Sequence, residues 1–289
     1  MAIKREVDAV SGVETTGHEW DGIRELDNPM PAWWKWVFYA SIVWAIAYWI
    51  VMPSWPWPGG ALPGVLGYSQ REVVAGSIAY ARSEQAVWRD RIAAVSLGDI
   101  RRDPQLRAFA IAGGRSAFAV NCSQCHGLGA AGSQGYPNLN DDEWLWGGSL
   151  EAIHRTISYG VRAGHPDTRV GEMLAFGDQG VLKRTEITDT VEYVLSLGGA
   201  SKAPDAVARG KEVFTANCVA CHGDDARGKA ELGAPDLTNR IWLYGSDRQT
   251  ITDTVTHGRA GMMPAWGGRI DPTTIKELAI YVHALGGGE

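Results

Sequence analysis

Residues 114–126 read GRSAFAVNCSQCH, and residues 210–222 read GKEVFTANCVACH. The two segments share the glycine, the phenylalanine, the asparagine and the Cys-x-x-Cys-His ending. Together they contain all 4 cysteines of the chain. Chance rarely places every cysteine of a protein in one short pattern, so this repeat decides how the rest of the sequence is interpreted.

The similarity continues downstream of both segments, as expected of an internal repeat. The matching pieces are YPNL at 136–139 and APDL at 234–237, WLWG at 144–147 and WLYG at 242–245, GEMLAFG at 171–177 and GMMPAWG at 261–267, and the apolar patterns of 187–197 and 275–285. The sequence therefore predicts a mainly α-helical protein with two similar domains in tandem, residues 108–200 and residues 201–289.

The Cys-x-x-Cys-His pattern is typical of covalent haem attachment. Cys122 and Cys125 are spaced to add to the two vinyl groups of one haem, and His126 then reaches the iron. The second repeat supplies the equivalent residues Cys218, Cys221 and His222. A structural zinc site would not explain why histidine follows both cysteine pairs. The sequence predicts two covalently bound haem c groups in two tandem class I cytochrome c domains.

Haem iron of this kind usually takes a second axial ligand. Methionine sulfur is common there, because it favours the reduced state and raises the reduction potential. The repeat alignment places Met173 opposite Met263, whereas Met262 lies opposite Glu172. We therefore expect Met173 and Met263 to be the distal ligands, each serving the histidine of its own repeat.

The two methionines have different neighbours in the chain. Pro264 comes directly after Met263, as in ordinary c-type cytochromes, but Leu174 comes after Met173. The alternative for either methionine is a side chain that fills the hydrophobic core and binds no iron. His165 lies in the segment that the first repeat adds before Met173, and it is the competing candidate for that iron.

Residues 32–52 read AWWKWVFYASIVWAIAYWIVM, with one charge, at Lys35. A helix rises about 1.5 Å per residue, so this stretch covers about 30 Å, the thickness of a bilayer hydrocarbon core. Tryptophans crowd both of its ends, as in interfacial aromatic belts. The sequence predicts a transmembrane helix over 32–52, and the alternative is a buried core helix.

The flanking segments complete the organisation. Prolines and glycines in 53–64 exclude a continued helix, and the pattern of 69–96 predicts an accessory helix or helix pair without chemistry of its own. We therefore expect a linker and accessory helix over 53–107. Haem is attached outside the bacterial cytoplasmic membrane. The expected protein is thus a single-pass inner-membrane protein with a cytoplasmic segment 1–31 and periplasmic haem domains.

Charge excludes one class of partner. The formal net charge is -6, and the chain contains no run of basic residues. Nucleic-acid binding normally needs a basic surface, so no nucleic-acid partner is expected.

The stretch from His18 to Lys35 reads HEWDGIRELDNPMPAWWK and leads directly into the apolar segment. With the single span and two Cys-x-x-Cys-His domains, it resembles the FixP/CcoP subunit of cbb3-type haem-copper oxidases over essentially the whole chain. The resemblance implies an electron-transfer subunit of the respiratory chain that is not an enzyme by itself and has no catalytic residue. Its expected donor is a soluble or membrane-bound cytochrome c or a cytochrome bc complex. Its expected partners in the oxidase are the monohaem and catalytic subunits.

The resemblance also implies roles for particular residues. The carbonyl oxygens of Pro137 and Pro235 should accept a hydrogen bond from Nδ1 of the haem histidines. The first and last helices of each domain should cross near the matching pairs of the repeat, namely Gly114 with Phe118, Gly210 with Phe214, and Tyr193 with Tyr281.

Two alternatives remain open at this point. One is the dihaem cytochrome subunit of another respiratory complex or of a periplasmic dehydrogenase. The other is an enzyme or gas sensor with one open haem site, which requires that Met173 does not bind iron. A visible spectrum distinguishes this last alternative, because an open site gives a high-spin haem that binds carbon monoxide.

Overall fold

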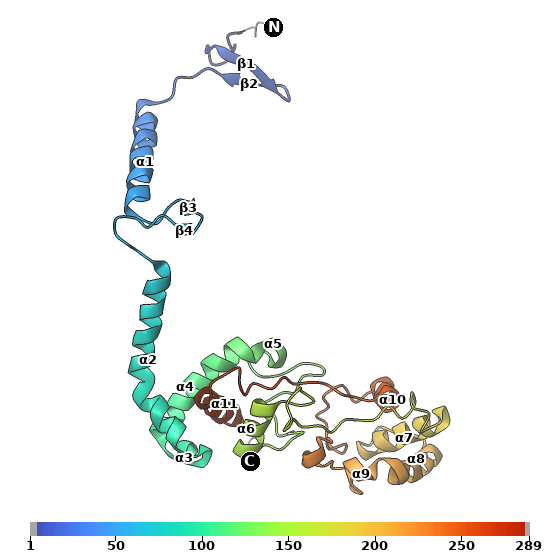
Figure 1. Cartoon of the computed structure of the whole chain (residues 1–289). Coiled ribbons are helices and arrows are strands. Elements are labelled where there is room, and N and C mark those ends of the chain that lie inside the picture. Colours follow the sequence, from blue (N-terminus) through green and yellow to red (C-terminus); the bar gives the residue numbers. More distant parts are fainter. Residues whose placement is uncertain (1–4, 287–289) are drawn as a thin grey trace. The chain divides into compact units, whose positions relative to one another are not determined.

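The computed structural model describes residues 5–286 and divides the chain into two compact units, Met1–Arg82 and Ser83–Glu289 (Figure 1). The first unit contains β1 (Thr15–Trp20), β2 (Ile23–Leu26), α1 (Ala32–Val51), β3 (Pro56–Trp57), β4 (Gly60–Ala61) and the start of α2 (Gln70–Ala94). The second contains the end of α2 and all later elements. The predicted mainly helical fold with an N-terminal candidate span is confirmed.

A small antiparallel hairpin precedes the apolar helix, which the sequence patterns did not predict. Strands β1 and β2 are joined by Asp21 and Gly22, both with positive φ, as a tight hairpin turn requires. Arg24 of β2 bridges Glu19 across the turn at 3.3 Å and Glu6 at 2.7 Å. The acidic N-terminal segment is therefore folded before the span begins.

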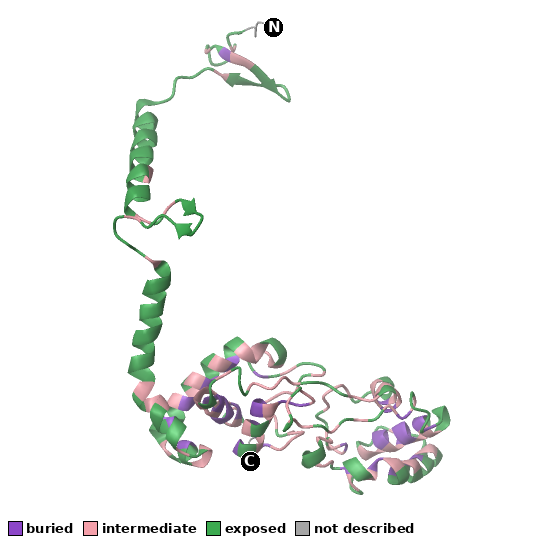
Figure 2. Ribbon diagram, in the orientation of Figure 1, coloured by how far each residue is buried: buried purple, intermediate pink, exposed green. Residues whose placement is uncertain are grey.

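Helix α1 coincides with the predicted span, and none of its residues is buried within the protein (Figure 2). This excludes the core-helix alternative. In the described part of the chain α1 alone is long and apolar enough to cross a membrane. The linker after α1 then folds back onto the C-terminal end of this helix. The amides of Val65 and Leu66 donate to the carbonyls of Ile50 and Val51, at 3.0 and 3.2 Å, and so satisfy two carbonyls that a helix end leaves unpaired.

The second unit is a set of short helices connected by long loops. They are α3 (Leu97–Arg102), α4 (Pro104–Asn121), α5 (Ser123–His126), α6 (Leu150–Tyr159), α7 (Arg184–Leu197), α8 (Pro204–Asn217), α9 (Val219–His222), the 3-10 helix η1 (Ala230–Leu232), α10 (Arg248–His257) and α11 (Pro272–His283). Side-chain caps fix several starts. Asp103 accepts the amides of Gln105 and Leu106 ahead of α4, and Asp271 accepts the amide of Thr274 in α11.

Two hydrophobic cores form two lobes in this unit. The first lobe consists of α4, α5, α6 and α11, and its buried core residues are Phe118, Ala130, Ile153, Ile157, Ile275, Leu278, Ala279 and Val282. The second lobe consists of α7, α8, α9 and α10, and its core residues are Phe176, Leu182, Ile187, Val191, Val194, Leu195, Phe214, Cys218, Ala226, Leu237, Ile251 and Val255.

Each lobe therefore combines helices from both repeats. The last helix of the chain, α11, packs on α4 of the first repeat, while α7 of the first repeat packs on α8 of the second (Figure 1). The predicted ranges 108–200 and 201–289 describe the repeats of the sequence. They do not describe the packed cores, because α7 and α11 have exchanged places. Both helices carry the same apolar pattern, so each suits the other's core.

The end of α2 belongs to the first lobe. Ile92 is fully buried there with Ile100, Leu106 and Ile280, and Trp88 stacks on Phe109 with ring centroids 6.0 Å apart. The C-terminal end of the accessory helix is thus part of the lobe's core.

The exchange predicts which helices lose protection when each core is weakened. Leu278→Ala in α11 and Val191→Ala in α7 remove side chains that are 0 % and 1 % exposed, and such a truncation of leucine costs about 2–5 kcal/mol. Hydrogen exchange measured by mass spectrometry should become faster in α4 for Leu278→Ala and in α8 for Val191→Ala. Contiguous domains would give the reverse, with Leu278→Ala loosening α8.

Candidate cofactor sites of the two repeats

Each Cys-x-x-Cys-His segment forms one helical turn at the end of a longer helix. In the first, the His126 amide donates to the Cys122 carbonyl at 3.0 Å, and the Cys125 amide donates to the same carbonyl at 3.1 Å. Side chains three and four positions apart are neighbours on a helix, so the Cys122 side chain lies beside those of Cys125 and His126. The segment from Cys218 to His222 repeats this geometry, with an amide-to-carbonyl distance of 2.9 Å.

The orientation of each histidine ring is fixed by a proline carbonyl. His126 Nδ1 lies 3.0 Å from the Pro137 oxygen, and His222 Nδ1 lies 3.2 Å from the Pro235 oxygen. A carbonyl only accepts, so Nδ1 carries the proton, and Nε2 is left as the unprotonated nitrogen that can bind a metal. Burial lowers the pKa of both imidazoles, which keeps them in the neutral form that binds metal. The expectation for both prolines is confirmed.

An aromatic pair lies beside each histidine. Phe118 lies 6.4 Å from the His126 ring and 5.5 Å from the ring of Tyr281, measured between centroids. The second lobe has the same arrangement. Phe214 lies 6.3 Å from the His222 ring and 5.0 Å from the Tyr193 ring. The two tyrosines come from α11 and α7, the exchanged helices, so each histidine is supported by a helix of the other repeat.

These helix crossings require glycine. A Cβ at Gly114 would overlap the main-chain oxygen of Glu277 and the Cβ of Tyr281, and a Cβ at Gly210 would overlap the main-chain oxygen of Asp189. The sequence patterns placed the crossings correctly at these glycines. However, the helix that crosses Gly114 is α11 of the second repeat, and the helix that crosses Gly210 is α7 of the first repeat.

The methionines follow the same exchange. Met263 packs against the core of the first lobe, which also includes Cys122, whereas Met173 packs against the core that contains Cys218. The expected pairing of Met173 with His126 and of Met263 with the second histidine therefore does not hold. The repeat alignment identified equivalent methionines, but it carried no information on which lobe each one enters.

Two chain segments cross between the lobes and are hydrogen-bonded to each other. Val161 and Met263 exchange amide-to-carbonyl bonds of 2.9 and 3.0 Å, and Met173 and Arg259 exchange two bonds of 2.9 Å. Gly160, which has a positive φ and precedes the first pair, would overlap the Met263 oxygen if it carried a Cβ. Main-chain bonds thus fix the position of both methionines in this crossover.

Arginines that the sequence patterns did not single out support the crossover. Arg169 lies over the Trp146 ring at 5.3 Å, and Arg259 lies over the Tyr244 ring at 4.3 Å, which are favourable cation–π contacts. Arg162 donates to the main-chain oxygens of both crossing segments, at positions 171 and 261. The repeat alignment could have identified these residues, because it pairs Arg169 with Arg259 and Trp146 with Tyr244.

The competing ligand candidates have other environments. His165 stacks on Tyr159 at 4.7 Å, and its Nδ1 accepts the amide of Asp167 at 3.1 Å. Met262 is 69 % exposed, unlike Met263 beside it. These observations favour the two core-facing methionines over the alternatives.

The chemistry of the residues present fits a covalently bound haem in each lobe. Burial raises the pKa of the Cys122 and Cys218 thiols to about 11, so each is a neutral sulfur suited to a thioether. A haem c held here would supply one-electron redox chemistry at an iron.

Family comparisons cover most of the chain. Residues 12–58 match the family model of the N-terminal domain of cytochrome oxidase-cbb3, FixP. Residues 109–194 and 205–282 each match that of cytochrome C oxidase, cbb3-type, subunit III.

Alignments with similar proteins extend over nearly the whole chain. The chain is 56 % identical over 291 residues to the cbb3-type cytochrome c oxidase subunit FixP of Bradyrhizobium sp. (strain ORS 278), with 100 % of both chains covered. It is 52 % identical over 286 residues to subunit FixP of Rhizobium meliloti (strain 1021), covering 99 % of this chain and 98 % of that protein. It is 50 % identical over 293 residues to subunit CcoP of Azospirillum brasilense, covering 99 % of both.

The helix crossing beside His126 can be tested by adding one methyl group. Gly114→Ala should lower the free energy of unfolding by about 1–3 kcal/mol, because the new Cβ overlaps α11 and forces the crossing apart. Denaturant unfolding followed by circular dichroism measures this. Gly98→Ala is the matched control in α3 of the same unit, where the nearest atom to a Cβ is 3.9 Å away, and it should leave stability unchanged or higher. Equal stability of the two variants would contradict the crossing.

Proposed function

Because the chain belongs to the FixP/CcoP family of cbb3-type cytochrome c oxidase subunits, we propose that it carries electrons on two covalently bound haem c groups, one in each lobe. It is an electron-carrying subunit of that oxidase, it works with the other oxidase subunits, and its cytochrome domains are of the c-type haem class. Helix α1 fits a single-pass membrane protein within the complex. The N-terminal family match at 12–58 argues against a dehydrogenase subunit.

The haem-binding residues are supplied by the two turns. Cys122 and Cys125 would hold the first haem through thioethers, and His126 would bind its iron. Cys218, Cys221 and His222 would do the same for the second haem. This assignment rests on each turn bringing two cysteines together with an imidazole that a proline carbonyl orients, beside a hydrophobic core. The repeats 108–200 and 201–289 are the units of sequence that carry these turns.

The distal ligands come from the opposite repeats. We assign Met263 to the iron bound by His126, and Met173 to the iron bound by His222. The support is that Met263 lies in the core with Cys122, and Met173 lies in the core with Cys218. A histidine and methionine pair favours a low-spin carrier over an open gas-binding site. Leu174 after Met173 does not weaken this assignment, since main-chain bonds to Arg259 hold the segment.

The direction of electron flow and the orientation complete the proposal. The lobes lie in the periplasm and residues 1–31 in the cytoplasm of a bacterial inner membrane. Electrons come from a cytochrome c or a cytochrome bc complex and pass to the monohaem subunit and then to the catalytic subunit, where oxygen is reduced. Support comes from the position of α1 before both haem-binding turns, because haem is attached outside the cytoplasmic membrane.

Removing either cysteine pair should remove one haem. The double variant Cys122→Ala, Cys125→Ala and the double variant Cys218→Ala, Cys221→Ala should each retain about half of the covalent haem, since a thioether has no substitute. Peroxidase-stained gels and the pyridine haemochrome spectrum measure this. Full haem content in either double variant would overturn the assignment of two haems.

The exchanged methionines can be assigned by combining variants. Met263→Leu should lower one reduction potential, because loss of sulfur removes a ligand that favours ferrous iron. In the Cys122→Ala, Cys125→Ala chain, Met263→Leu should then have no effect on the remaining haem. Redox titration followed by visible spectroscopy gives both results. Met262→Leu is the control that leaves both potentials unchanged, and a lowered potential of the remaining haem would restore the contiguous pairing.

A further inference from the structure

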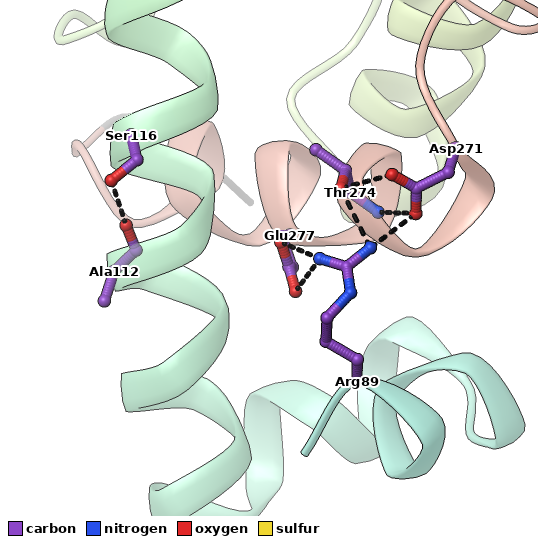
Figure 3. A network of polar contacts seen from close by, with 6 residues as sticks. All are labelled: Arg89, Ala112, Ser116, Asp271, Thr274 and Glu277. Carbon is purple, nitrogen blue, oxygen red and sulfur yellow. Dashed lines mark hydrogen bonds and ion pairs between the residues drawn. The ribbon is translucent and has the colours of Figure 1, made fainter. Parts of the chain in front are cut away.

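An arginine from the accessory helix reaches into the first lobe. Arg89 of α2 donates through Nη2 to Asp271 Oδ1 at 2.6 Å and through Nη1 to both oxygens of Glu277, at 3.3 and 3.4 Å (Figure 3). Its Nη2 also donates to Thr274 Oγ1 at 3.2 Å. The accessory helix thus places a charged side chain against α11, which the sequence patterns did not predict.

Glu277 is a buried acid at a helix crossing. It is 2 % exposed and lies where α11 passes α4. A Cβ at Gly113 would come within 2.6 Å of Glu277 Oε2, so the glycine lets the main chain of α4 approach the carboxyl group closely. Desolvation raises the pKa of Glu277 to about 7, although Arg89 opposes the rise, and Asp271 adds to it. The group therefore exchanges a proton near neutral pH.

Several other charged groups around this crossing are engaged elsewhere. On α11, Lys276 donates to main-chain carbonyls at the end of α2, at 2.7 to 3.1 Å. On α6, burial and the nearby Lys276 lower the pKa of His154, and on α3, Arg102 pairs with Asp99 at 2.6 Å. Within the described residues, Arg89 and Asp271 are the charges that act on Glu277. The remaining titratable or charged residues of these helices and of the end of α2 are Glu84, Asp90, Arg91, Arg101, Arg107, Arg115, Glu151, Arg155, Tyr159, Tyr281 and His283.

The equivalent acid of the second lobe has a different environment. The repeat alignment pairs Glu277 with Asp189, which lies at the crossing of α7 and α8 beside Gly210. Asp189 is held by both Nε and Nη2 of Arg209 at 2.7 Å, and this hydrogen bonding lowers its pKa. The residue that corresponds to Arg209 in the first repeat is Gly113. The second lobe supplies its own cation to its acid, while the first lobe receives its cation from α2.

A short path connects Glu277 to the proximal histidine. Gly113 and Phe118 lie five positions apart on α4, which corresponds to about 7.5 Å of helix rise. Phe118 is 6.4 Å from the His126 ring. Charges that far apart at the surface are screened by salt, but buried ones are screened much less. A change of charge at an iron bound by His126 would therefore act on Glu277 through the buried core around Phe118.

Resting on the proposed haem of the first lobe, we propose that Glu277 takes up a proton when that haem is reduced, and that Arg89 is the positioning residue that tunes this uptake. The balance is one electron from the donor to ferric iron and one proton from solvent to the Glu277 carboxylate. The reverse occurs on oxidation. The equivalent acid of the second lobe, Asp189, is held ionised by Arg209 and should have no such coupling.

The sign of the effect is set by electrostatics. An added electron makes the ionised carboxylate less favourable, so reduction raises the pKa of Glu277. Coupling is reciprocal, so binding a proton favours reduction by the same factor. The reduction potential of the first-lobe haem should therefore fall as the pH rises through neutrality.

The test is a spectroelectrochemical titration of the purified full chain between pH 6 and pH 8. The first-lobe haem is identified as the one absent from the Cys122→Ala, Cys125→Ala chain. Its potential should fall with pH in the native protein, and Glu277→Gln should make it less dependent on pH. Arg89→Met should move the pH-dependent step to higher pH, because the cation that lowers the pKa of Glu277 is lost. Asp189→Asn is the matched control and should leave the step unchanged.

The possible results distinguish the role of Glu277, the role of Arg89 and the proposed function from one another. A first-lobe potential with the same pH dependence in Glu277→Gln as in the native protein overturns the proposal, since other acids then cause the dependence. An Arg89→Met chain whose step does not move overturns the role of Arg89, even if Glu277→Gln fails to fold. Haem content is measured for every variant. A missing first haem in the native chain would instead contradict the proposed function.

Discussion

The arrangement of both candidate sites depends on the main-chain pairing of two crossing segments. Residues around Val161 and Met173 run from the first lobe to the second, and those from Arg259 to Met263 run back. Backbone hydrogen bonds between them satisfy polar groups of the crossover that would be costly to leave unpaired in a partly buried position. Because α7 and α11 lie beyond this crossover, the pairing also decides which helix completes each core.

An exchange of this kind has consequences for an electron carrier. In two independent domains joined by a linker, the distance between the haems would vary with the linker. Here neither lobe is complete without a helix and a methionine segment from the other repeat, so the exchange ties the two candidate sites together. The exchange therefore limits how far the two sites can separate.

The two lobes share a fold but not the same buried charges. At the equivalent crossing, one lobe places Asp189 against its own Arg209, and the other buries Glu277 against Arg89 from a helix outside the repeat. The hydrogen bonds from Arg209 lower the pKa of Asp189, whereas desolvation raises the pKa of Glu277 even though Arg89 opposes the rise. The accessory helix therefore adds to the first lobe a property that the repeat alone does not have.

The sequence by itself determined the local chemistry of this protein. The Cys-x-x-Cys-His turns, the apolar span that became α1, the prolines facing His126 and His222, and the glycine crossings are all set by short-range patterns, whose spacing fixes geometry within a few helical turns. Only the tertiary structure decided which repeat supplies Met173 or Met263 to each lobe. Equivalent helices have interchangeable apolar faces, so the choice depends on long-range backbone pairing. It also decided that Arg89 meets Glu277, a contact across 188 positions that no local pattern encodes.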